Sequence, residues 1–128
     1  MSIKFKVIEK GQPGVKGGGQ KKYYASVVTD GETTIDDLVK EIEKFSSLSE
    51  PDIRGVIVAL ENTIQNKLSE GKIVRLEKLG SLYPSISSEG VENAEDATSG
   101  IIKGASINYR PGERLKKAIN DAGFKKVS

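Results

Sequence analysis

The chain has 128 residues, 36% of them hydrophobic and 5% aromatic, which is the length of one domain with a mostly aliphatic core. It contains neither cysteine nor histidine, and this excludes disulfides, thiolate or imidazole metal ligands, and the Cys/His and Ser/His pairs of nucleophilic enzymes. No apolar run approaches the ~20 residues that a membrane-spanning helix needs. The N-terminal residues contain no signal-peptide core. We therefore expect a soluble, cytoplasmic protein, although carboxylate, lysine, tyrosine or serine chemistry stays open on these grounds. With the features described below, we expect no enzymatic activity, no metal, no membrane contact and no small-molecule cofactor.

The net charge of +2 is small, but the charges are unevenly distributed along the chain. Residues 1–30 carry six lysines and two carboxylates, residues 31–70 carry four basic and nine acidic side chains, and residues 71–128 carry ten basic and seven acidic ones. Basic ends around an acidic middle could gather one sign of charge on one face for a polyanionic partner. Ordinary solvated surface explains the same counts, and the charges alone favour neither interpretation.

The first thirty residues predict a β-hairpin. Residues 3–8 alternate between apolar and basic side chains, and residues 22–28 are rich in tyrosine and valine. The glycine-rich residues 11–20 connect them as a long, mobile tip. This loop lacks the Gly-Lys-Ser/Thr ending of a phosphate-binding loop and precedes a strand, which argues against a nucleotide site.

Two helices follow in the predicted order. The first, over about residues 34–46, has an apolar stripe formed by Ile35, Leu38, Val39, Ile42 and Phe45. The second has Ser49 as its N-cap, Gly71 at its end, and a stripe formed by Ile53, Val56, Ile57, Leu60, Ile64 and Leu68. Two such stripes beside a small sheet would leave apolar surface exposed in a monomer, which predicts dimerisation.

The last third predicts strands and one short helix. Residues 72–86 form a strand pair that turns near residues 78–80, with core positions Val74, Leu76, Leu79 and Leu82. Residues 87–100 are a polar excursion, a strand returns at 101–110, and a helix follows at 112–121. Its inward side chains should be Leu115, Ala118 and Ile119. The tail over residues 121–128 should be partly ordered at most.

Three stretches together resemble the HU and integration-host-factor family. They are the helical hairpin from Thr34 to Gly71, the segment Val74–Leu82, which resembles V-x-L-x-G-F-G-x-F, and the segment Tyr109–Lys116, which resembles F-R-x-G-K-x-L-K. The resemblance covers about two thirds of the chain. It implies an α+β, HU-like (IHF-like) DNA-binding fold: a helical hairpin, a small antiparallel sheet with an arm, and a short C-terminal helix. We expect a single domain over residues 1–128, with an N-terminal β-hairpin extension at 1–31, an HU-like core at 33–120, an arm near 85–102 and the tail at 121–128.

The resemblance also implies a function. Family members are bacterial, histone-like, nucleoid-associated homodimers whose sheets form a saddle on which double-stranded DNA lies. The side chains expected to contact phosphates are Arg75, Lys103, Arg110, Arg114, Lys116 and Lys117. The N-terminal extension could add Lys4, Lys6, Lys21 and Lys22. A hairpin that only protects the edge of the sheet is an equal alternative for this extension.

The arm departs from the family pattern. Family arms are rich in Arg and Lys and end in a proline wedge that kinks DNA. Here residues 85–102 contain no Lys, Arg or Pro and carry four carboxylates, Glu89, Glu92, Glu95 and Asp96. We therefore expect weak bending, or an HU-like scaffold that no longer binds DNA and acts as a protein-interaction module. A metal site on these carboxylates is disfavoured because the loop has no rigid frame. Two smaller departures are Lys78 in place of a glycine and Glu113 in place of a lysine.

Overall fold

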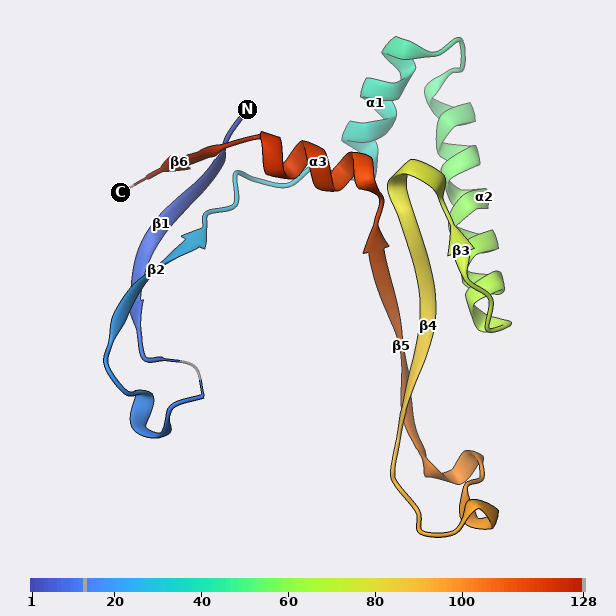
Figure 1. Cartoon of the computed structure of the whole chain (residues 1–128). Helices are drawn as coiled ribbons and strands as arrows, with labels where there is room; N and C mark the ends of the chain where they lie inside the picture. The colour runs from blue at the N-terminus through green and yellow to red at the C-terminus, as the bar shows by residue number, and fades with distance from the viewer. Residues whose placement is uncertain (13, 128) are drawn as a thin grey trace. The chain divides into compact units, whose positions relative to one another are not determined.

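The computed structural model describes residues 1–12 and 14–127, and the chain is a mixed α+β protein (Figure 1). It divides into two compact units. Unit 1 comprises Met1–Ile35 and Lys117–Ser128, and unit 2 comprises Asp36–Lys116. Pro13 of the predicted loop and Ser128 of the predicted tail lie outside the described residues. Whether the two units behave as one domain stays a prediction.

Unit 1 is a three-stranded sheet in the order β2-β1-β6. Strands β1 (Ile3–Lys10) and β2 (Lys22–Val27) pair antiparallel, as the sequence predicted, and their connection contains a 3₁₀ turn at Lys16–Gly18. The C-terminal strand β6 (Phe124–Lys126) pairs with β1 in parallel, with Ile3 opposite Phe124. The prediction of a partly ordered tail is therefore wrong for these residues. No local pattern indicated this strand, because its partner lies at the other end of the chain.

Two helices open unit 2. Helix α1 covers Ile35–Phe45 and helix α2 covers Glu50–Ser69, within a residue or two of the predicted bounds. The Ser49 hydroxyl accepts a hydrogen bond from the Asp52 amide at 3.4 Å and donates one to the Asp52 carboxylate at 2.9 Å. This N-cap satisfies a backbone donor that the first turn leaves without a partner. An ion pair between Arg54 and Asp36 joins the two helices.

The second sheet has the order β3-β4-β5. Strand β3 (Val74–Arg75) leads through a 3₁₀ turn at Glu77–Leu79 into β4 (Gly80–Ser88), which pairs antiparallel with β5 (Ile102–Pro111). The β4–β5 ribbon extends away from the helices as the arm (Figure 1), and 3₁₀ turns at Ala94–Asp96 and Ser99–Ile101 lie at its outer end. Helix α3 (Glu113–Asp121) follows β5.

Gly80 and Gly112 bring the start of β4 against the end of β5. A Cβ atom on Gly112 would lie 2.2 Å from the Lys78 carbonyl oxygen, and one on Gly80 would lie 2.2 Å from the Arg110 carbonyl oxygen. Gly80 also has φ +117°, a conformation that other residues rarely adopt. Gly112 is therefore needed for close backbone approach. These two glycines hold Arg110 next to the turn that precedes β4.

The core of the single chain is small. Among the described residues, the buried apolar side chains are Val39 of α1 and Ile53 of α2. The predicted core positions Leu79, Leu115 and Ile119 are 56%, 38% and 59% exposed, and Ala118 is exposed as well. These four predictions are wrong for the isolated chain, because sequence spacing marks a side chain as apolar but does not determine whether the chain itself covers it. Apolar faces of both α1 and α2 remain open too, including Phe45 at 90% and Val56 at 61%.

Candidate nucleic-acid interface

The β3-β4-β5 sheet has one polar and one apolar face. Successive residues of a strand point to opposite faces, so Ser81, Tyr83 and Ser85 of β4 share one face and Leu82, Pro84 and Ile86 share the other. The cross-strand register extends each face onto β5: Ser81 lies opposite Arg110 and Leu82 opposite Tyr109. The polar face is therefore the candidate for a polyanionic ligand.

Two arginines meet at the inner end of the polar face. Arg75 of β3 lies opposite Ser81 of β4, and Ser81 lies opposite Arg110 of β5, so the three residues form a row across three strands. The Arg75 Nη1 atom is 3.5 Å from the Ser81 hydroxyl oxygen. A shallow pocket of about 210 Å³ is lined by Ile73, Arg75, Ser81, Tyr83 and Arg110. We call Arg75 and Arg110 the arginine row. Two guanidinium groups beside hydroxyl groups are suited to phosphate oxygens.

The polar face continues along the arm with neutral groups. The Asn108 side-chain amide donates to the Ser85 hydroxyl at 2.7 Å, and the Ser85 and Ser106 hydroxyls are 2.8 Å apart. These residues can exchange hydrogen bonds with a backbone or groove but add no charge. The sequence reading missed Ser81, Tyr83, Ser85 and Asn108. The sequence alone does not show the register of the three strands. Once the register is known, the alternation of side chains places these residues on the same face as Arg75 and Arg110.

The opposite face of the same sheet is apolar. With α2 it forms an open groove of about 740 Å³ whose apolar lining includes Ile64, Leu68, Leu82, Pro84 and Ile107. Such a surface is suited to a protein partner, because little on it can pair with phosphates.

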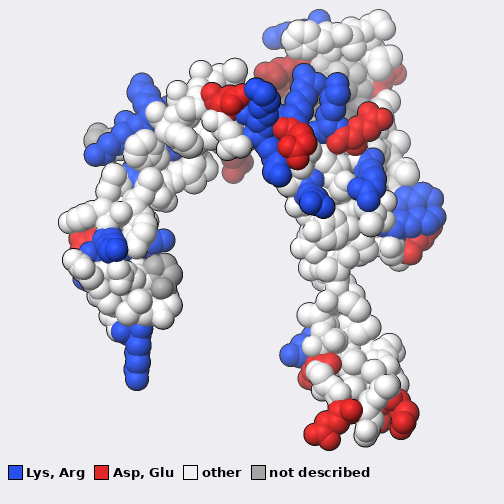
Figure 2. Space-filling view, in the orientation of Figure 1, with Lys and Arg blue, Asp and Glu red and all other residues white. Residues whose placement is uncertain are grey.

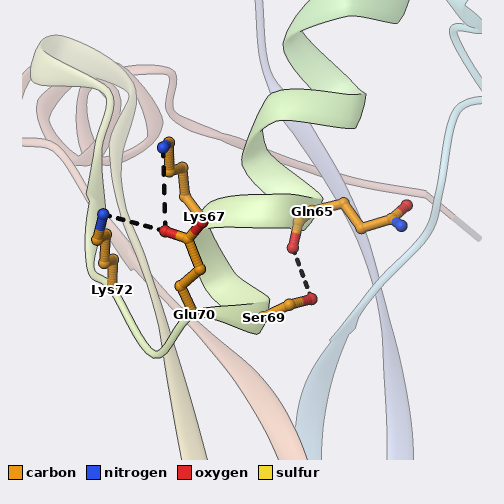
Figure 3. Close-up of polar contacts among 5 residues, drawn as sticks. All are labelled: Gln65, Lys67, Ser69, Glu70 and Lys72. Atoms are coloured by element: carbon orange, nitrogen blue, oxygen red, sulfur yellow. Dashed lines mark hydrogen bonds and ion pairs between the residues drawn. The ribbon is translucent and has the colours of Figure 1, made fainter.

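Carboxylates already hold other basic side chains of unit 2. At the end of α2 the Glu70 Oε2 atom lies 3.0 Å from the Lys72 Nζ atom and 3.9 Å from the Lys67 Nζ atom (Figure 3). The Ser69 hydroxyl donates to the Gln65 carbonyl oxygen at 2.8 Å in the same last turn (Figure 3). Such pairs reduce the positive charge near Lys67 and Lys72, so this cluster is a weaker phosphate site than the arginine row.

The structure places the other predicted DNA contacts apart from the arginine row. Lys103 lies beside the β-bulge at Ser87/Ser88, seven residues along β5 from Arg110, which is about 23 Å at the usual rise of a strand. Arg114 is exposed on α3, and the Lys116 Nζ atom lies 3.8 Å from a Glu113 carboxylate oxygen. Lys117 belongs to unit 1, and its Nζ atom is 2.8 Å from an Asp121 carboxylate oxygen. The roles of all six residues remain predictions.

In unit 1, Lys4 and Lys6 lie on one face of β1 and Lys22 lies opposite Lys10 on β2. Lys21 precedes β2. The sequence analysis missed Lys10, although Lys10 points to the same face of β1 as Lys4 and Lys6. It also missed Lys125 of β6, which had no local signal.

The four arm carboxylates, which lie at residues 89–96, flank or belong to the first 3₁₀ turn of the arm. Figure 2 shows acidic side chains at the outer end of the arm and basic ones over the body of unit 2. Within residues 1–12 and 14–127, no group of three or more carboxylates is placed to hold a metal ion. Across the same residues, no helix is both long and apolar enough to cross a membrane.

These features define a class: a small α+β chain with a helical hairpin, an arm-bearing antiparallel sheet, and a cationic patch on the polar face of that sheet. The family model described as "HU domain fused to wHTH, Ig, or Glycine-rich motif" (HU-HIG) matches residues 1–126. The chain therefore belongs to the HU-HIG family, which agrees with the resemblance seen in the sequence. None of the curated proteins matches the chain in sequence.

Among solved structures, the chain is similar to one from Bacteroides vulgatus described as a "Putative bacterial DNA binding protein". The TM-score is 0.70 at 12% sequence identity, and the match covers 98% of this chain and 48% of that one. At this identity the likeness concerns the fold. The chain spans about half the length of the protein it matches.

Proposed function

We propose that this protein binds double-stranded DNA without sequence preference, through the phosphate backbone, as a non-enzymatic architectural protein of the bacterial nucleoid in the cytoplasm. The observation that carries the proposal is the arginine row, where Arg75 and Arg110 flank a hydroxyl-lined pocket on the exposed polar face of the sheet. The family match and the DNA-binding description of the Bacteroides structure support it. Binding needs no cofactor.

The proposed contacts are the arginine row and further basic side chains of both units. In unit 2 and α3 they are Arg75, Lys103, Arg110, Arg114, Lys116 and Lys117, and in the N-terminal extension they include Lys4, Lys6, Lys21 and Lys22. If ~4 to 6 phosphates are neutralised, the affinity falls steeply as salt is added. Bending is weak, because the arm carries four carboxylates and no wedge proline.

The protein acts as a homodimer in this proposal. In the described part of the chain, the buried apolar side chains are Val39 and Ile53, and apolar faces of both long helices are open. So small a core does not offset the conformational entropy lost on ordering the chain. A second copy packed on the helices supplies the missing burial. Light scattering after size-exclusion chromatography should give twice the 13.8 kDa of one chain.

The test of DNA binding is a fluorescence anisotropy titration with a duplex of ~30 base pairs at several salt concentrations. We expect Arg75→Gln/Arg110→Gln to weaken binding about tenfold or more and to lower the salt slope by about 2. The matched control is Lys67→Gln/Lys72→Gln, which removes the same charge from side chains that Glu70 already holds. Equal losses in both variants, or no binding by the native protein at low salt, would contradict the proposal.

One observation favours a second function. Unit 2 contains eleven basic and fourteen acidic residues, a net charge of −3, and its apolar groove is suited to a protein partner. The alternative is an HU-like scaffold that has lost DNA binding and serves protein interactions. A pull-down from lysate with and without nuclease separates the two, because partners that depend on DNA disappear after nuclease treatment.

A further inference from the structure

We infer that one face of the unit 1 sheet is a second phosphate-binding surface for double-stranded DNA, separate from the arginine row. This inference rests on the proposed function and deepens it, because it joins three of the proposed N-terminal contacts with Lys10 and Lys125 into one surface. The surface, called the lysine face below, consists of Lys4, Lys6 and Lys10 of β1, Lys22 of β2 and Lys125 of β6.

The register places these five lysines on one side of the sheet. Lys4, Lys6 and Lys10 are separated by even numbers of residues along β1, so their side chains point to the same face of the sheet. Lys22 lies opposite Lys10, and Lys125 lies opposite Lys4. The Lys10 ammonium group lies 5.0 Å from the centre of the Tyr24 ring, which places the two side chains on the same face.

The other side of the sheet is apolar, so the two sides are sharply different. Ile3, Phe5, Val27 and Phe124 line a shallow groove of about 440 Å³ there. Glu9 is an even number of residues from Ile3 and Phe5, so its side chain points to this apolar side. On the lysine face, the strand residues other than lysine are Ile8, Tyr24 and Ser26, none of which is acidic.

Most lysines of the lysine face have no carboxylate partner among the described residues. The Lys4 Nζ atom lies 3.3 Å from an Asp30 carboxylate oxygen. Lys6, Lys10, Lys22 and Lys125 are exposed, and no ion pair is recorded for them among the described residues. Unit 1 as a whole has nine lysines and four carboxylates, a net charge of +5. Figure 2 shows its basic side chains with few acidic ones beside them.

The dimensions of the lysine face suit a duplex backbone. Lys4 and Lys10 are six residues apart, about 20 Å along β1. Double-stranded DNA carries one charge per ~1.7 Å of axis, so a row of this length passes several phosphates. The lysines are spread along an exposed face of the sheet and do not converge on one point, and this favours an extended polyanion over a small anion.

The test compares two variants of the whole protein that lose the same charge. Lys6→Gln/Lys125→Gln removes two lysines of the face. Lys16→Gln/Lys126→Gln removes two others of unit 1, and Lys126 lies opposite Phe5 on the apolar side. In the duplex titration we expect about a tenfold or larger loss of affinity and a salt slope lower by about 2 for the first variant. The control should lose less than about threefold.

Three further measurements make the outcome decisive. Lys6→Arg/Lys125→Arg should restore native affinity, and thermal melts should show that the Gln variants are folded. Adding Arg75→Gln/Arg110→Gln to the lysine-face variant should multiply the two losses, as expected for separate surfaces. Equal losses of affinity in the lysine-face variant and its control would mean that only the net charge matters, and would overturn the inference. An unchanged affinity of the lysine-face variant would overturn it as well. If the arginine variant alone has no effect while the lysine-face variant loses affinity, the arginine row fails and the lysine face stands.

Discussion

The two units of this chain differ most in where their positive charge lies. Unit 2 has a helical hairpin and an arm but a net charge of −3, and its candidate phosphate site is the arginine row. Unit 1 is a minimal sheet, yet it has a net charge of +5 and concentrates five lysines on one face. In this chain the excess of positive charge lies in unit 1, whereas the outer end of the arm in unit 2 is acidic.

The difference shows that the arrangement of strands and helices does not determine where the positive charge lies. The arm keeps the ribbon geometry while its tip carries carboxylates that phosphates repel. A scaffold therefore does not determine which of its surfaces meets the ligand. Substitutions in unit 2 test this contrast.

The largest effect should come from Gly80→Ala, which acts on unit 2 alone. The new methyl group would lie 2.2 Å from the Arg110 carbonyl oxygen, and φ is +117° there. We expect a loss of about 3 kcal/mol or more in unfolding free energy, measured by urea denaturation followed by circular dichroism. Gly90→Ala is the control, because its Cβ would meet no atom within 4 Å. Equal stabilities of the two variants would refute the close approach.

Next in size is the effect of Val56→Glu on self-association. Val56 is 61% exposed on the apolar side of α2, where we place the second copy. Burying a carboxylate there should raise the dimer dissociation constant about 100-fold or more. Val58→Glu is the control, since Val58 is 47% exposed on another side of α2. Analytical ultracentrifugation should find a monomer for the first variant and a dimer for the second, and a dimer for both would place the interface elsewhere.

A smaller effect is expected from neutralising the arm with Glu92→Gln/Glu95→Gln. Removing two repelling charges should strengthen duplex binding about threefold, because the repulsion is partly screened by salt. The control, Glu41→Gln/Glu61→Gln, removes two helix charges and should change the affinity less. Anisotropy titrations that find no gain from the arm variant would show that the arm stays away from DNA.

The smallest effect concerns the turn between the helices. A hydrogen bond with the Glu50 carboxyl, some desolvation and repulsion by Glu50 raise the pKa of Glu43 above its ordinary value of 4.5. Because the pKa is raised, protonation of Glu43 stabilises the folded protein. This contribution to the free energy of unfolding is complete below pH 4.5 and is lost as the pH rises through the folded-state pKa. Glu43→Gln should therefore raise the melting temperature slightly at pH 7. Its advantage should shrink as the pH approaches 4.5, and melts that show a constant difference would contradict this.

The sequence predicted the local elements well because their signals are local. The Ser49 cap, the helical stripes and the alternation of β1 each lie within one element, and the structure places them within a few residues of the expected bounds. Positions that depend on distant partners were less predictable. Leu79 and Leu115 were assigned to the core by pattern, but they are exposed in the single chain.

The candidate site was predictable in part for the same reason. Arg75 and Arg110 were named from the sequence, but only the register of β3, β4 and β5 shows that they meet beside Ser81. Lys103 and Lys117 were named with them and lie apart. Lys125 joins the lysine face through a strand pairing that no local pattern reveals.

That long-range pairing has a consequence for biosynthesis. Ile3 and Phe124 are 121 positions apart, so the ribosome must deliver nearly the whole chain before β1 can acquire its parallel neighbour. Until then the nascent hairpin has one unsatisfied edge and an apolar side facing water, the kind of surface that chaperones and stray strands bind. Contacts of such sequence separation form slowly. The assembly of unit 1, and with it the full lysine face, should therefore be among the last steps of folding.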